Sequence, residues 1–205
     1  MSFLELKKSL GDQLVFSVND IKKIDQAFDY RRLTEWQQKG YLKKIIKGHY
    51  LFADRELGEL DLFAVANRIY HPSYISLESA LRHYDLIPEG VFSVTSVAAK
   101  KTSRFQTPIG LFSYRKVKTD CFFGYMVLER AGAKVKIALP EKAIIDYLYL
   151  RPDLRDKKDL AALRINHDSF KERVDLKKIE AYLKRIGQKS LSRRVGLLLK
   201  TMDYA

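Results

Sequence analysis

Residues 30–52 read YRRLTEWQQKGYLKKIIKGHYLF, and this stretch decides how the first part of the chain folds. Asp29 precedes it as a helix-capping residue, and Gly40 stands where a helix commonly ends in a left-handed residue. A helix is therefore predicted over 30–39. The β-prone runs on either side of Lys47-Gly48 predict a hairpin, because glycine can adopt the positive φ of a tight turn.

Two more helices are predicted before this stretch. The spacing of apolar residues between Phe3 and Leu10 predicts a helix that ends near Gly11. The sequence Ser17-Val-Asn-Asp20 has the form of a capping box with aspartate in place of glutamate, and apolar residues follow it at helical spacing. Three helices followed by a hairpin is the order of a winged helix-turn-helix, so residues 1–54 are predicted to form such a DNA-binding domain.

Helical geometry divides the predicted helix at 30–39 into two sides. Leu33 and Trp36 share one side, which is predicted to pack into the core. The opposite side can read base edges, since arginine suits guanine, glutamine suits adenine and glutamate accepts from cytosine. Flanking basic residues suit phosphates. The residues predicted to contact double-stranded DNA are Arg31, Arg32, Thr34, Glu35, Gln38, Lys39, Lys43, Lys44, Lys47 and His49.

The formal net charge is +13, and the basic residues are grouped. Nucleic acid is the commonest anionic partner of such a protein. Residues 31–50 hold six lysines and arginines against one acid, Glu35. A second group at 100–118 contains no acid, and it is interpreted either as an additional contact surface for nucleic acid or as a strand edge protected by charge. Its members are Lys100, Lys101, Arg104, Arg115, Lys116 and Lys118.

The polar segment 53–60, ADRELGEL, marks a predicted boundary, and residues 55–205 are predicted to form a second domain. Its predicted helices include one capped by Ser76 and one that begins at Pro140. Strands are predicted over 91–97, 111–117, 122–128 and 134–139, and tail helices over 156–164, 175–186 and 190–201. The predicted fold class is α+β: an N-terminal winged helix-turn-helix, then a larger mixed α/β domain with a mostly antiparallel sheet and C-terminal helices.

Three stretches are similar to the AbiEi antitoxins of bacterial type IV toxin–antitoxin systems. They are RRLTEWQQKGYLKKIIKGHYLF (31–52), YISLESALRHYDLIPEG (74–90) and LPEKAIIDYLYLR (139–151). The chain departs from the family at Asp85, where glycine is expected in a turn, although aspartate can also adopt the left-handed conformation. The resemblance implies a winged helix that binds inverted repeats and represses its own operon. It also implies a C-terminal antitoxin domain that counters a nucleotidyltransferase-like toxin without forming a stable complex with it.

Sequence motifs of common enzyme classes are absent: there is no phosphate-binding loop, nucleophile elbow or zinc-protease motif. The four histidines are scattered, so neither a metal nor a cofactor is expected. Glu141 is interpreted as interacting with the N-terminus of its own helix rather than as a catalytic acid. No membrane-spanning run or signal peptide is recognisable, and Cys121 is predicted to be buried, which together favour a cytoplasmic protein that makes no membrane contact.

Two other functions are left open by the residues. One is a free-standing winged-helix transcription factor whose C-terminal domain senses a small molecule, because the aromatic residues at 112–125 could line a pocket. The other is a nucleic-acid-processing enzyme built from scattered acidic residues. The chain is not expected to be an enzyme, because no set of residues has the spacing of a catalytic motif.

Overall fold

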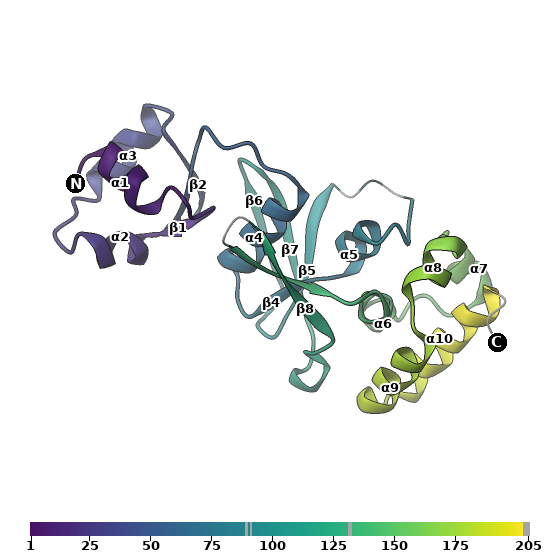
Figure 1. Cartoon of the computed structure of the whole chain (residues 1–205). Helices are drawn as coiled ribbons and strands as arrows, with labels where there is room; N and C mark the ends of the chain where they lie inside the picture. The colour runs from purple at the N-terminus through teal and green to yellow at the C-terminus, as the bar shows by residue number, and fades with distance from the viewer. Residues whose placement is uncertain (89, 91, 131–132, 203–205) are drawn as a thin grey trace.

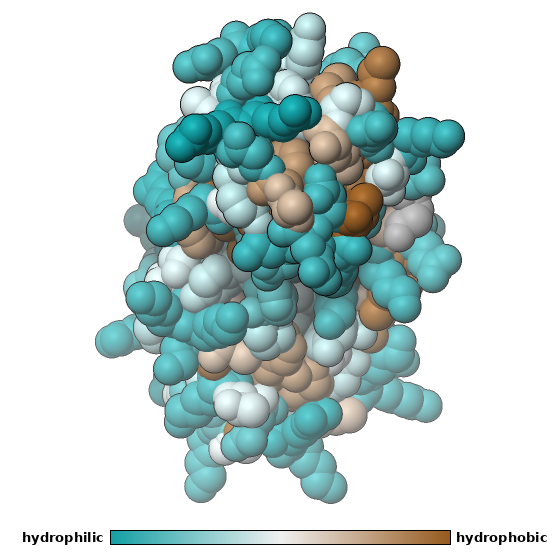
Figure 2. All heavy atoms as spheres, turned by 90° about the vertical axis from the view of Figure 1, so that its left-hand side faces the viewer, coloured by the Kyte–Doolittle hydropathy of each residue, from teal (hydrophilic) through white to brown (hydrophobic). Residues whose placement is uncertain are grey.

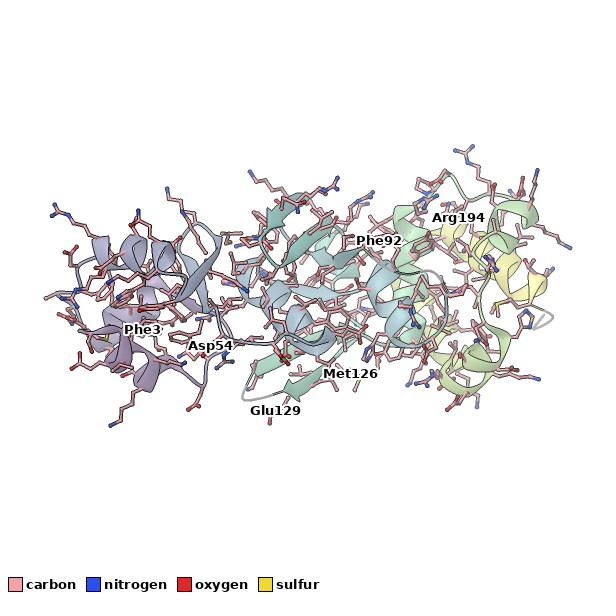
Figure 3. The ribbon with its side chains drawn as sticks, turned by 90° about the horizontal axis from the view of Figure 1, so that it is seen from above. Phe3, Asp54, Phe92, Met126, Glu129 and Arg194 are labelled. Atoms are coloured by element: carbon pink, nitrogen blue, oxygen red, sulfur yellow. The ribbon has the colours of Figure 1, made fainter. Side chains whose placement is uncertain are left out.

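In a computed structural model, which describes residues 1–88, 90, 92–130 and 133–202, the chain is an α+β protein. The described parts contain ten α-helices, a three-stranded antiparallel sheet and a six-stranded mixed sheet. Figures 1 and 3 show them in a row: an N-terminal unit, a central sheet with its helices, and a helical C-terminal part. The predicted α+β class is confirmed. Glu89 and Val91, which belong to predicted segments, lie outside the described residues.

The N-terminal unit has the predicted order of helices and strands. Its elements are α1 (Phe3–Leu10), β1 (Phe16–Ser17), α2 (Val18–Ile24), α3 (Arg31–Gln38), β2 (Leu42–Ile46) and β3 (His49–Phe52). The strands pair antiparallel in the order β1-β3-β2. The predicted capping box at the start of α2 is formed, because Ser17 and Asp20 each accept a hydrogen bond from the other's backbone N–H.

Two glycines have the backbone conformation that the sequence predicts. Gly40 follows α3 with a φ of 71°, and Gly48 lies in the β2–β3 turn with a φ of 79°. Both values fall in the left-handed region, which a residue with a Cβ atom adopts only at a cost of about 1 kcal/mol. The helix end near residue 39 and the hairpin around Gly48 are therefore confirmed.

The six-stranded sheet forms the centre of the molecule. Its strands are β4 (Ser73–Ile75), β5 (Ser93–Ala98), β6 (Ser103–Thr107), β7 (Gly110–Lys116), β8 (Tyr125–Arg130) and β9 (Ala133–Ala138). Their order is β6-β7-β5-β4-β9-β8, in which β5–β7 and β4–β9 are parallel pairs and the other neighbours are antiparallel. The sequence prediction lacks β4 and β6, since β4 is very short and β6 has no run of apolar residues.

Helices cover both faces of this sheet. Helix α4 (Glu59–Ile69) lies on one face, where the Tyr114 hydroxyl on β7 donates to the Ala66 carbonyl at 2.8 Å. Helix α5 (Leu77–His83) lies on the other face over β5, where the Ser79 N–H donates to Thr95 Oγ1 at 3.0 Å. Helix α6 (Pro140–Leu150) begins with proline as predicted and packs beside α5.

The C-terminal part consists of further helices. They are α7 (Lys157–Ala161), α8 (His167–Arg173), α9 (Leu176–Ile186) and α10 (Lys189–Thr201). Helices α9 and α10 pack on α6, and α7 packs on α10. Helix α8 is missing from the sequence prediction, and the other three lie within about two residues of their predicted bounds at most ends. A 3₁₀ turn at Thr119–Cys121 leads from β7 towards β8, and the Cys121 side chain is buried as predicted.

Two hydrophobic clusters hold the molecule together. The smaller one lies inside the N-terminal unit and contains Ile21, Leu33 and Trp36. The larger one fills the central and C-terminal parts, and it also includes Ile45 and Leu51 from the β2–β3 hairpin. The N-terminal sheet therefore uses both faces, one for its own helices and one for the central unit. The polar segment 53–58 connects β3 to α4 across this junction.

Candidate nucleic-acid interface

The orientation of α3 is set by two buried side chains. Leu33 is 3% exposed and Trp36 is 5% exposed, as the sequence predicts. The Trp36 ring packs against the rings of Phe3 and Phe28, with centroids 5.6 and 5.7 Å away. Removing such a ring typically costs about 3–5 kcal/mol, far more than a surface contact contributes. Rotation of α3 about its axis is thereby prevented, and its outer face is fixed.

The outer face of α3 carries the predicted base-reading residues. Arg31, Thr34, Glu35 and Gln38 are exposed and follow one another at helical spacing. With Asp29 and Arg32 they line a shallow depression. Figure 1 shows α3 on the side of the N-terminal unit away from the central sheet. Across the described residues, no hydrogen bond engages the side chains of Arg31, Thr34 or Gln38, so these three groups can bind a ligand without losing a protein contact.

Two other predicted residues on α3 already have partners. Lys39 Nζ lies 2.6 Å from Glu35 Oε1, and both side chains are half exposed. This contact lowers the pKa of Glu35 and raises the pKa of Lys39. Arg32 donates from Nη1 to the Met1 carbonyl at 2.6 Å. An exposed pair of this kind contributes little stability, so an anionic ligand can compete for Lys39 and for the remaining donors of Arg32.

The hairpin places three lysines on the surface. Lys43 and Lys44 lie on β2 and Lys47 lies in the turn before Gly48, and all three are exposed. In the part of the chain that the structure describes, none of them pairs with a carboxylate. Figure 2 views this end of the molecule and shows a mostly hydrophilic surface with small apolar groups between the polar side chains. The hairpin is therefore suited to contacts with phosphates.

His49 lies differently from the other predicted contacts. Its side chain is half buried beside the junction with the central unit, and Nδ1 lies 3.4 Å from the Lys47 carbonyl. Burial lowers the pKa of His49 below its ordinary value of 6.5, and the positive charge of Arg68 acts in the same direction. At neutral pH the imidazole is thus mainly uncharged, which suits a structural role better than a phosphate contact.

The second basic group is exposed but does not form a single face. Its members lie in the β5–β6 turn, on β6 and β7, and just after β7; they are Lys100, Lys101, Arg104, Arg115, Lys116 and Lys118. Strand β6 is an edge of the sheet and lies next to β2, also an edge strand (Figure 1). Successive side chains on β7 point to opposite faces of the sheet, so Arg115 and Lys116 lie on different faces.

A buried polar network connects helix α6 to strand β4 and to the residue that follows it. Lys142 and Asp146, one helical turn apart on α6, form an ion pair in which both side chains are essentially inaccessible. The same carboxylate accepts hydrogen bonds from the Tyr74 hydroxyl at 2.8 Å and the Ser76 hydroxyl at 2.9 Å. Ser76 thus bonds to Asp146 and not to the end of α5, which corrects the predicted cap. The spacing of Lys142 and Asp146 on a mostly apolar helix is the signal that could have indicated the pair.

Glu141 also has a different partner from the predicted one. Its side chain is 1% exposed, and Oε1 accepts a hydrogen bond from the backbone N–H of Asp175 at 2.9 Å. Asp175 is the N-cap of α9, so Glu141 joins α6 to another helix and does not interact with its own N-terminus. A single sequence cannot reveal this contact, because it joins residues far apart in the chain.

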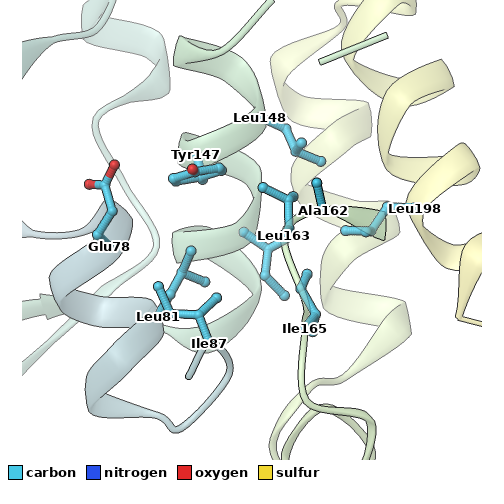
Figure 4. Close-up of a pocket in the computed structure, with 10 residues that line it drawn as sticks. Glu78, Leu81, Ile87, Tyr147, Leu148, Ala162, Leu163, Ile165 and Leu198 are labelled. Atoms are coloured by element: carbon cyan, nitrogen blue, oxygen red, sulfur yellow. The ribbon is translucent and has the colours of Figure 1, made fainter. Parts of the chain in front are cut away.

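An apolar cavity of about 260 Å³ lies between α5, α6 and the C-terminal helices (Figure 4). Glu78 and Tyr147 lie on one side of it, and Leu163, Ile165 and Leu198 lie on the other. The aromatic residues at 112–125 do not line it, since Phe112 and Tyr114 are completely buried in the core of the sheet. Phe112 and Tyr114 therefore belong to the core of the sheet and not to this cavity.

Among the described residues, no group of three histidine, cysteine, aspartate or glutamate side chains is arranged to hold a metal ion. None of the helices in the described ranges has the length and apolar character needed to cross a bilayer. No protein-family model matches the chain, and no curated protein matches it in sequence.

Proposed function

We propose that this chain is a DNA-binding transcriptional autorepressor and the antitoxin of a type IV toxin–antitoxin system. In this proposal the N-terminal unit acts as a winged helix-turn-helix, and α3 enters the major groove of an inverted-repeat operator in the chain's own promoter. The remainder of the chain counters a nucleotidyltransferase-like toxin without a stable complex. The antitoxin half of the proposal rests on the three stretches similar to the AbiEi family.

One observation carries the regulator half of the proposal. The side chains of Arg31, Thr34 and Gln38 lie side by side on the exposed face of α3, and none of them forms a hydrogen bond with the described residues. Two buried apolar side chains hold that helix in place. Arginine and glutamine form bidentate contacts with guanine and adenine, so the face offers the donors that base reading requires. The exposed lysines of the adjoining hairpin supply contacts to phosphates that fix the register. The net charge of +13 favours association with DNA over a long range.

The regulator proposal is tested with the DNA upstream of the chain's own gene. The purified protein should shift a promoter fragment at physiological salt, and it should shift a shuffled fragment of equal length only at a protein concentration about 10³-fold higher or more. Footprinting should locate the protected bases within an inverted repeat. Equal affinity for both fragments would overturn the regulator half.

The antitoxin proposal needs a separate experiment. A neighbouring gene should encode a nucleotidyltransferase-like protein whose expression arrests growth, and co-expression of this chain should restore growth. A variant of α3 that no longer binds the promoter should still restore growth when both genes are expressed from foreign promoters. Loss of protection in that variant would show that the two activities are not carried by separate parts of the chain.

The apolar cavity favours a second candidate, a free-standing transcription factor that senses a small molecule. A cavity of about 260 Å³ is close to the size of known ligand sites, and it is lined mainly by apolar side chains with two polar groups. Indole would serve as a probe: it should raise the thermal unfolding temperature of the chain and change promoter affinity. Filling the cavity by Ala162→Leu should remove both effects. A bound probe that leaves promoter affinity unchanged would speak against a sensor.

A further inference from the structure

The central sheet has an open area that the proposed function does not use. Helix α5 covers β5 on one face of the sheet, but β7 and the edge strand β6 extend beyond it on that face. The step between α5 and the uncovered strands forms a groove of about 420 Å³. This volume lies within the range of small-molecule sites, and strands give such a site a rigid floor.

The floor of the groove contains two arginines beside hydroxyl groups. Arg104 on β6 is the direct partner of Ser113 on β7, and Ser113 is in turn the partner of Thr95 on β5. These three residues form a row across the sheet, and Arg115 lies two positions further along β7 on the same face. Arg104 and Arg115 are exposed, and no carboxylate in the described ranges pairs with either guanidinium. Two guanidinium groups that no described carboxylate engages thus lie on one face of the sheet.

The wall of the groove combines apolar groups with one acid. Leu77, Ile87 and Leu111 supply the apolar part, and Glu78 supplies a carboxylate. Leu77 has a φ of 59°, a left-handed conformation that costs a non-glycine residue about 1 kcal/mol or more and that recurs at ligand sites. The Thr95 hydroxyl fixes this turn by donating to the Ser76 carbonyl at 2.8 Å. This turn therefore fixes the backbone next to Glu78, which lines the same groove as the arginines.

An exposed aromatic ring stands at the rim of this groove. Phe92 is 99% exposed, although it is a large apolar residue (Figure 3). Isolated exposed rings gain nothing from packing within the fold, whereas they can stack on the flat face of a ligand. One depression therefore contains two arginines, the carboxylate of Glu78 as a hydrogen-bond acceptor, and a set of apolar side chains. The exposed Phe92 ring stands at its rim.

We propose that this groove binds a nucleotide. Arg104 and Arg115 hold the phosphate through charge-assisted hydrogen bonds, because guanidinium groups match the geometry of phosphate oxygens. The base lies on the apolar wall and the rim, and the Glu78 carboxylate accepts a hydrogen bond from an amino group of the base. The nucleotide comes either from solution or from a single-stranded RNA, since both offer the same phosphate, sugar and base.

The proposal is tested by titrating the full chain with ATP, AMP, inorganic phosphate and a fluorescent oligo(A) RNA. The nucleotides should bind in the micromolar to low millimolar range and phosphate more weakly. The double variant Arg104→Ala/Arg115→Ala should weaken nucleotide binding about tenfold or more. The matched control Lys116→Ala/Lys118→Ala removes the same charge from the same part of the chain outside the groove, and it should change binding less than about threefold.

Further variants and competitors distinguish a free nucleotide from a single-stranded RNA as the ligand. They also separate binding in the groove from general attraction by positive charge. Glu78→Gln should change the preference among bases but not the affinity for phosphate. If RNA is the natural ligand, oligo(A) should bind far more tightly than ATP, and ATP should compete with it. Arg31→Ala should leave nucleotide binding unchanged, so failure of the promoter experiment does not affect this one. Equal losses in the groove and control variants, or no nucleotide binding by the unaltered chain, would overturn the proposal.

Discussion

Asp20 in the first turn of α2 and Arg68 in the last turn of α4 form an ion pair at 2.7 Å, and this contact joins the N-terminal unit to the central unit. The same carboxylate accepts hydrogen bonds from the backbone N–H and the hydroxyl of Ser17, each at 2.7 Å. Burial opposes the charged form of Asp20, but the hydrogen bonds from Ser17 and the guanidinium of Arg68 lower its pKa. One side chain therefore caps a helix and positions that helix against the rest of the molecule.

Loss of Asp20 should cost more stability than loss of Arg68. Asp20→Ala removes a helix cap and leaves Arg68 without its partner, so the free energy of unfolding should fall by about 2 kcal/mol. Arg68→Ala should cost less than about 1 kcal/mol, because the arginine is half exposed and the cap survives. Urea unfolding measures both values. Lys23→Ala, which removes an exposed charge 3.8 Å from the same carboxylate, serves as the control with little effect. Equal costs for Asp20→Ala and Arg68→Ala would contradict the double role of Asp20.

His49 should make the folded state sensitive to mild acid. Because burial lowers the pKa of His49 in the folded protein, the unfolded chain binds a proton more readily than the folded one. The stability should therefore be complete above about pH 6.5 and should decrease as the pH falls from there towards the lower pKa of the folded state. His49→Gln should flatten this dependence. Thermal unfolding between pH 5 and 7.5, at constant ionic strength, is the measurement; parallel curves for the variant and the unaltered chain would refute the assignment.

Signals within a few residues of each other predicted the N-terminal unit well. The capping box at Ser17, the turns at Gly40 and Gly48 and the inward direction of Leu33 and Trp36 are all local properties. Each depends on the backbone geometry of a single turn or helix, which a sequence specifies directly. Asp85 belongs to the same class, since it adopts the left-handed conformation, with a φ of 55°, that its place in the turn requires.

Contacts between distant residues explain what the sequence could not predict. Strand β4 has only three residues, and its neighbours β5 and β9 lie far along the chain, so no local period marks it. Glu141 contacts the N–H of Asp175, and Lys142 lies beside Tyr74; both contacts exist only after the helices pack. The pKa of His49 likewise depends on the charge of Arg68 in the central unit. In the candidate interface, local periodicity thus predicted the face of α3 but not the burial of a hairpin residue.

Removing only one charge of the Lys142–Asp146 ion pair should lower the free energy of unfolding more than removing both charges together. Asp146→Asn keeps an acceptor for the Tyr74 and Ser76 hydroxyls but leaves the Lys142 ammonium buried without a counter-charge. Breaking a buried pair in this way typically costs about 3–5 kcal/mol. The double variant Lys142→Met/Asp146→Asn removes both charges and should recover at least about 1 kcal/mol of that loss. Chemical denaturation of the two variants is the comparison, and a double variant less stable than the single one would contradict the explanation.

The two parts of the candidate interface should respond differently to substitution. Arg31→Ala and Gln38→Ala remove groups that read base edges, so each should cost about 1–3 kcal/mol on the preferred operator and less on operators altered at the contacted base pair. Lys44→Ala and Lys47→Ala remove contacts to phosphates, so they should weaken binding to all sequences by similar factors. The dependence of log affinity on log salt should become shallower by about 0.9 for each lysine that contacts a phosphate. Fluorescence anisotropy over a series of salt concentrations separates the two effects, with Lys177→Ala as a control for charge far from the interface. An Arg31→Ala variant that loses the same free energy on every sequence would show that α3 does not read bases.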